Sequence, residues 1–173
     1  MKKRILLASI MVLMILAVAY PQNEKKKFKG SLDGFEEVPA ISTSGSGDFL
    51  ISINNNETEI AYELSYSDLE GDVTQAHIHL GQAGVNGGVM AFLCSNIGGP
   101  PGTQPCPPSP ATVSGTLTAS DVIGPAAQGI AAGEIAEMIK AIRTGATYVN
   151  VHSTLFPGGE IRGQIRPNKK NDD

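Results

Sequence analysis

Turn-forming residues divide this chain into runs that are too short for most helices. Clusters of Gly, Pro and Asn recur between Phe28 and Ile165, and the whole chain has 20 Gly and 11 Pro. In the run that contains Ile60, Tyr62 and Leu64, apolar residues occupy every second position. This period is that of a strand with one buried face. The sequence therefore predicts a mainly β fold, an antiparallel sandwich or barrel of about seven or eight strands.

The same pattern places the individual elements. Strand-like sequence begins at Phe28, and further strands are expected at residues 48–53, 60–66, 74–80, 89–94, 112–117, 147–153 and 159–165. The Asn run at 54–56 is a strong turn signal, so the first two of these should form a hairpin. One inserted helix is expected near residues 133–143, because Ile135, Met138, Ile139 and Ile142 share one face at helical spacing.

The amino terminus has the layout of a secretory signal. Basic residues at positions 2–4 precede an apolar run from Ile5 to Ala19, which ends in the small residues Ala17-Val18-Ala19. We expect a signal peptide over 1–19, a polar linker over 20–27, one domain over 28–166 and a charged tail over 167–173. An uncleaved membrane anchor is the alternative reading of the first segment.

Charge narrows the possible partners. The chain has a net charge of −4 and a pI near 5.3. Loss of residues 1–19 would remove three basic residues and no acidic one, which leaves about −7. Nucleic-acid binding is not expected, since it normally needs a basic face. The composition and the signal predict a soluble acidic domain that is secreted, periplasmic or held at the cell surface.

The two cysteines, Cys94 and Cys106, flank a segment rich in Gly and Pro. An exported protein meets an oxidising environment, where two cysteines usually form one disulfide. The bridge would close a loop of about a dozen residues and contribute roughly 2–3 kcal/mol. Thiolate metal ligation is the alternative, although the spacing is not that of a CxxC motif.

The three histidines carry the clearest chemical signal. His77 and His79 lie two apart on an expected strand, so their rings share one face. His152 lies on another expected strand, where it shares a face with Asn150. Such a pair and a distant third histidine could hold one ion, and copper binds imidazole most tightly among common divalent metals. The alternative is that the histidines are hydrogen-bonding residues of the sheet without a ligand.

Several polar residues could support such a site. Asn150, Glu160 and Arg162 are candidates to orient a ligating imidazole, although a surface ion pair is an alternative for Glu160 and Arg162. Of Glu36 and Glu37, one could face inward. No catalytic residues are assigned, because no phosphate loop, nucleophile elbow, HExxH or dinucleotide motif occurs.

Four motifs in order resemble those of the CHRD (chordin) domain family: residues 32–39, 76–81, 148–153 and 157–165. The likeness runs from about Phe28 to Ile165, and the helix ending at 141–145 also fits. The resemblance implies an extracellular module. In animal chordin this module belongs to an antagonist of bone morphogenetic proteins, whereas microbial members are short exported proteins. Nothing here resembles the growth-factor-binding repeats of chordin.

A weaker likeness is to copper/zinc superoxide dismutase, a sandwich with an HxH pair on one strand. His77 and His79 could match that pair and His152 a later copper ligand. No histidine remains for the bridging position or for the rest of a zinc site, so dismutase activity does not follow. A sandwich of the immunoglobulin or dismutase type fits both the strand count and this likeness.

Three functions remain open. The first is a secreted, non-enzymatic binding module with one copper ion at the three histidines. The second is a metal-dependent redox enzyme, and the third is a structural matrix protein without metal. The expected partner is an extracellular protein or surface; self-association is possible, and a membrane contact is expected only if the first segment stays uncleaved.

Overall fold

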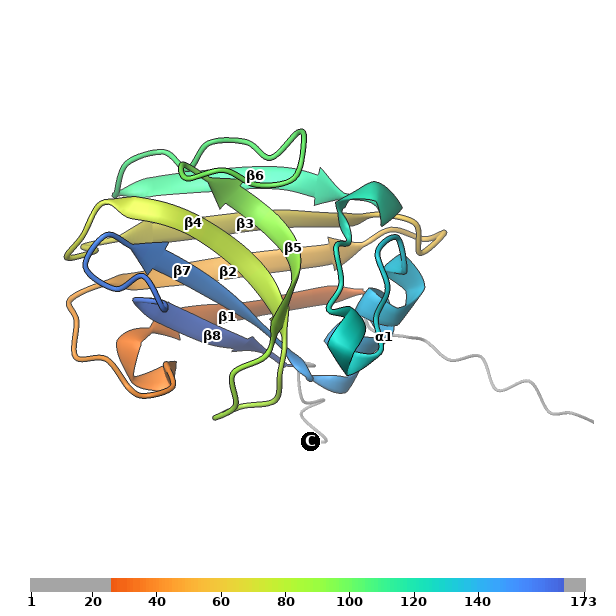
Figure 1. The fold of residues 1–173 in the computed structure, drawn as a ribbon, viewed down its shortest axis with the longest axis horizontal. Coiled ribbons are helices and arrows are strands. Elements are labelled where there is room, and N and C mark those ends of the chain that lie inside the picture. Colours follow the sequence, from red (N-terminus) through yellow and green to blue (C-terminus); the bar gives the residue numbers. More distant parts are fainter. Residues whose placement is uncertain (1–25, 167–173) are drawn as a thin grey trace, which may run out of the picture.

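The computed structural model describes residues 26–166, which contain eight antiparallel strands joined in one sheet (Figure 1). The strands are β1 (Lys27–Asp33), β2 (Ser46–Ile53), β3 (Ile60–Ser67), β4 (Val73–Leu80), β5 (Gly88–Ser95), β6 (Ala111–Leu117), β7 (Thr147–Ser153) and β8 (Ile161–Ile165). The mainly β prediction is confirmed. The predicted signal peptide, most of the linker and the tail lie outside the described residues.

The strands form one sheet in the order β5-β4-β7-β8-β1-β2-β3-β6, which curls into a nearly closed barrel. The β2–β3 hairpin forms as predicted, with Ile53 opposite Ile60. Most strands differ from the sequence prediction by one or two residues at one end or both. Strand β1 already begins at Lys27, within the expected linker, and β8 begins at Ile161 rather than at residue 159. Gly159 has a φ of 132°, which is not an extended conformation, so β8 begins after this residue.

Side chains close the seam between the two edge strands, β5 and β6. The Tyr62 hydroxyl donates to the Leu93 carbonyl at 2.6 Å. The Gln104 amide donates to the carbonyls of Leu93 on β5 and Ser114 on β6, at 3.3 and 3.0 Å. These bonds give partners to carbonyls that an open strand edge would leave exposed.

The barrel interior is apolar and continuous. Its fully buried side chains come from every part of the sheet and include Phe28, Leu32, Ile51, Leu64, Ile78, Val149 and Ile161. Burial of this surface is the main stabilising contribution to the fold. It also fixes which side chains of each strand point outward, because neighbours along a strand alternate between faces.

The one α-helix among residues 26–166, α1 (Ile135–Thr144), agrees with the predicted helix near 133–143. Met138, Ile139 and Ile142 are buried on its apolar face. Gly145 ends it in the left-handed conformation, with a φ of 75°. The Arg143 guanidinium contacts the Glu57 carboxylate at 2.9 Å, which fastens α1 to the β2–β3 turn. In the described part of the chain, no helix has the length and apolar character needed to cross a bilayer.

Candidate metal centre

Strand pairing brings the three histidines together on the outer face of the barrel. β4 and β7 are neighbours, and their register sets His79 opposite Tyr148, His77 opposite Asn150 and Gln75 opposite His152. The intervening residues Ala76, Ile78, Val149 and Val151 fill the interior. One nitrogen from each histidine lies within 4.8 Å of the others. The adjacency that a three-histidine site requires is therefore present.

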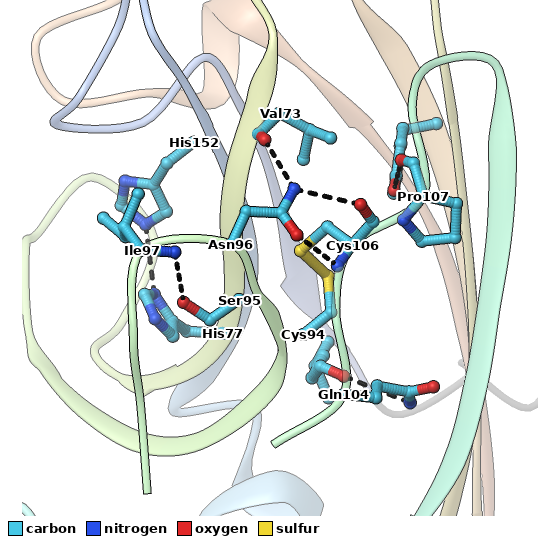
Figure 2. The surroundings of a disulfide bond; sticks show 12 residues. Val73, His77, Cys94, Ser95, Asn96, Ile97, Gln104, Cys106, Pro107 and His152 are labelled. Atoms are coloured by element: carbon cyan, nitrogen blue, oxygen red, sulfur yellow. Dashed lines mark hydrogen bonds between the residues drawn. A yellow bond between two sulfur atoms is a disulfide. The ribbon is translucent and has the colours of Figure 1, made fainter.

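Hydrogen bonds assign the protons on these rings. His79 Nδ1 lies 3.0 Å from the Gly87 carbonyl, and His152 Nδ1 lies 3.0 Å from the Pro157 carbonyl. A carbonyl can only accept, so both Nδ1 atoms carry a proton and both Nε2 atoms carry a lone pair. His77 Nδ1 lies 3.2 Å from His152 Nε2 and donates to it (Figure 2).

Two of the lone pairs have no partner. The Nε2 atoms of His77 and His79 are buried without a hydrogen bond. A buried polar atom left unsatisfied costs about 1–3 kcal/mol. Two such atoms within one histidine cluster form a donor set suited to a transition-metal ion.

Burial keeps the rings neutral. His77, His79 and His152 are only 2%, 7% and 6% exposed. Desolvation is the main reason that the pKa of His77 falls to about 3, and the neighbouring His152 and His79 lower it further. Desolvation also lowers the pKa of His79, to about 4, and the pKa of His152. Neutral imidazole is the form that binds metal, so at pH 7 no proton need leave the ligands.

Aromatic rings form the walls of the cluster. The Phe92 ring meets His77 edge-on, with ring centroids 4.3 Å apart. The Tyr148 ring is stacked on His79, with centroids 4.7 Å apart and an angle of 6° between the planes. The Arg162 guanidinium carbon lies 3.4 Å from the centroid of the Tyr148 ring. His79 is therefore one aromatic ring away from a buried cation.

Comparison with known families identifies the domain. The family model for the CHRD domain matches residues 28–165. The chain belongs to the CHRD domain family. No match was found among curated proteins or among solved structures. The match covers the whole barrel, all three histidines and both cysteines of this CHRD domain.

Three loops of the CHRD domain cover the outer face that carries the histidines. The 34–45 loop places Glu37 against Asn150, whose amide donates to the carboxylate. The 81–87 loop supplies the Gly87 carbonyl to His79, and the 154–160 loop supplies the Pro157 carbonyl to His152. The orienting partners of two rings are thus backbone carbonyls, which residue types do not reveal.

The candidate supporting residues lie on this covered face or beside it. Asn150 also donates to the Ile161 carbonyl, at 3.0 Å. Glu160 is fully buried and accepts from the Thr43 hydroxyl and the Glu70 amide, both at 2.7 Å. Arg162 is 1% exposed and donates to the carbonyls of Gln82 and Val85. Among the described residues no ion pair joins Glu160 to Arg162, and neither lies at the surface.

Sequence reasoning missed Tyr148 and left Glu37 undecided. Tyr148 precedes Asn150 by two positions, so the alternation that placed Asn150 and His152 on one face also includes Tyr148. Glu37 is 7% exposed, and desolvation raises its pKa to about 7, although the Asn150 bond and the Arg162 charge oppose that rise. A Cβ at Gly159 would lie 2.6 Å from Glu37 Oε1, so only glycine leaves room for this carboxyl.

The predicted disulfide is confirmed between Cys94 and Cys106. Figure 2 shows Asn96 beside it, where its side-chain amide donates to the carbonyls of Val73 and Cys106 at 3.0 Å. The Cys106 amide donates back to Asn96 Oδ1 at 3.0 Å. The bridge and Asn96 together hold the segment between β5 and β6 against the start of β4.

Proposed function

We propose that this CHRD domain is an exported, non-enzymatic binding module that holds one copper ion at His77, His79 and His152. The observation that carries the proposal is the pair of buried, unpartnered Nε2 atoms beside a third imidazole. The rings are neutral, and backbone carbonyls fix two of them, as is usual for metal-ligating histidines.

The donor set fits copper. Nitrogen atoms at about 2.0–2.1 Å from one ion lie no more than about 4.2 Å apart. The present separations reach up to 4.8 Å, so small ring movements would bring all three nitrogens to one ion. Imidazole also suits zinc and iron, but copper stands highest in the affinity order of the divalent ions.

Two observations support export and a holding role. A disulfide persists in an oxidising compartment, which agrees with the secretory signal read from the sequence. The unpartnered ring nitrogens of His77 and His79 are closed to solvent, which favours retention of an ion over turnover of a substrate. Membership of the CHRD family supports a binding module.

The test is the metal content and copper affinity of the exported chain, prepared without a histidine tag. We expect one copper ion per chain, and His79→Gln should weaken binding at least 100-fold. Glu63→Gln, on the exposed face of β3, is the control and should bind as the wild type does. Failure to bind copper at pH 7 in either oxidation state, Cu(I) or Cu(II), would contradict the proposal and leave the structural role. Catalytic turnover of superoxide by the copper-loaded protein would favour the redox enzyme instead.

A further inference from the structure

We infer that the ion held here is cuprous, Cu(I), and that the site disfavours divalent ions by charge, with Arg162 as the residue that strengthens this preference. The inference rests on the proposed copper site and goes beyond it, because it names the oxidation state and its cause.

The donor set is electrically neutral. Within the described residues, the group able to hold an ion consists of three histidines, with no carboxylate and no thiolate. A bound Cu(I) would leave a local charge of +1, and Cu(II) or Zn(II) would leave +2. Charge buried away from water is costly unless it is paired, and the cost rises steeply with the size of the charge.

The coordination number favours the same ion. Cu(I) is stable with three ligands, whereas Zn(II) normally takes a fourth ligand and Cu(II) favours a tetragonal arrangement with more ligands than three. The His77 and His79 nitrogens are sealed from solvent, and the Phe92 and Tyr148 rings pack against the two histidines.

A buried cation adds to the discrimination. Arg162 stacks on Tyr148, and Tyr148 stacks on His79, so the guanidinium stands directly behind one ligand. The guanidinium carbon is 3.4 Å from the Tyr148 ring centroid, and that centroid is 4.7 Å from the His79 centroid. Over such a range, at an effective dielectric of about 20, each additional positive charge on the ion would lose on the order of tenfold in affinity. Arg162 itself bonds to neutral groups, the carbonyls of Gln82 and Val85 and the side-chain oxygen of Asn86.

Glu37 supplies only a partial counter-charge to Arg162. The Glu37 carboxyl interacts electrostatically with Arg162. Its pKa of about 7 means that it is only partly ionised at neutral pH. The guanidinium charge is therefore only partly neutralised at the histidine cluster.

The decisive experiment compares affinities of the untagged, disulfide-bonded chain for three probe ions. Cu(I) is titrated anaerobically against a colorimetric Cu(I) chelator, and Cu(II) and Zn(II) are titrated against chelators of known affinity. We expect Cu(I) to bind at least 100-fold more tightly than either divalent ion. A chain that binds Cu(II) or Zn(II) as tightly as Cu(I) would overturn the inference and leave the metal site standing. A chain that binds none of the three ions would overturn the proposed function as well.

Variants assign the preference to Arg162. In Arg162→Gln the ratio of Cu(I) to Cu(II) affinity should fall about tenfold, and in Arg162→Lys, which keeps the charge, it should stay within about threefold of the wild type. Tyr148→Phe, which keeps the ring, should leave the ratio unchanged. An unchanged ratio in a folded Arg162→Gln protein would remove Arg162 from the account. If that variant does not fold, the wild-type ratio still decides the oxidation state.

Discussion

Strands β3 and β7 share an inner face of one kind and differ on the outside. Both point apolar side chains into the barrel, such as Leu64 on β3 and Val149 on β7. On β3 the outer residues Ala61 and Glu63 are exposed, whereas every residue of β7 is buried. The outer face of β7 is polar nonetheless, with Asn150 and His152 among its side chains.

This difference separates a strand whose outer face is exposed to solvent from one whose covered outer face carries part of the candidate metal centre. The outer face of β3 is exposed to solvent, so its polar side chains can hydrogen-bond to water. Burying polar groups costs free energy unless they are hydrogen-bonded. The domain nevertheless covers β4, β7 and β8 with three loops and keeps their polar side chains beneath them. The proposed metal site would account for this arrangement.

The largest expected effect is a loss of stability at acidic pH, which comes from the buried histidines on the covered face. The three histidines all lie on β4 and β7, and their pKa values lie below the ordinary 6.5 in the folded state. Below pH 6.5 the unfolded chain binds protons that the folded chain does not, so the histidines' contribution to stability is complete above that pH and is lost toward pH 4, partly offset by Glu37. We expect a loss on the order of 3–5 kcal/mol in the metal-free protein.

Denaturant unfolding across pH 4–7 measures this loss. The free energy of unfolding should depend less steeply on pH in His79→Gln, because one of the three histidines with a lowered pKa has been removed. A wild-type stability that stays constant between pH 6.5 and pH 4 would mean that the histidines are open to water.

Truncation of an outer side chain should cost far more on β8 than on β3. Arg162→Ala would leave the Gln82 and Val85 carbonyls without their donor and remove the cover of Tyr148, at a cost of about 3 kcal/mol. Glu63→Ala should change the free energy of unfolding by less than about 0.5 kcal/mol. Equal costs for the two variants, measured at pH 7, would erase the distinction between the faces.

The seam where the two ends of the sheet meet should depend on the disulfide. The double variant Cys94→Ala/Cys106→Ala frees a loop with a sequence separation of 12 residues, and we expect a loss of about 2–3 kcal/mol. Chemical denaturation under oxidising conditions measures it. Because the bonds of Tyr62 and Gln104 across the seam remain, the variant should still fold; a completely unfolded variant would show that these bonds do not suffice.

Alkaline pH should reveal the smallest effect, at Glu37. Its pKa of about 7 lies above the ordinary 4.5, so the folded chain keeps a proton that the unfolded chain has lost, and stability falls as pH rises from 4.5 through 7. Glu37→Gln keeps an acceptor for Asn150 and removes this dependence. The variant should gain about 1–2 kcal/mol over wild type at pH 8 and little at pH 5. The matched control Glu36→Gln, on an exposed neighbour, should show no such gain.

The local features of the fold could be predicted from the sequence because they depend on local alternation. The helix appeared from the spacing of Ile135, Met138, Ile139 and Ile142, and the β2–β3 hairpin from its Asn turn. The choice between sandwich and barrel stayed open, because it depends on pairings such as β1 with β8, which join the two ends of the chain. Nothing local specifies them.

The candidate site was predictable in its ligands and not in its surroundings. Alternation placed His77 with His79 and His152 with Asn150, but only the β4–β7 register shows that the two pairs meet. The carbonyls of Gly87 and Pro157 carry no side-chain signal. The burial of Glu37 depends on the 34–45 loop folding back over β7. No local pattern in the sequence of that loop indicates this position.

The most direct test of the copper site is the anomalous scattering of copper in crystals of the copper-loaded, untagged domain. The account predicts one strong peak among His77, His79 and His152, with a nitrogen of each ring at about 2.0–2.1 Å from it. Copper located elsewhere on the chain, or no peak while the three rings keep the positions described here, would contradict the claim that this covered polar face exists to hold a metal ion.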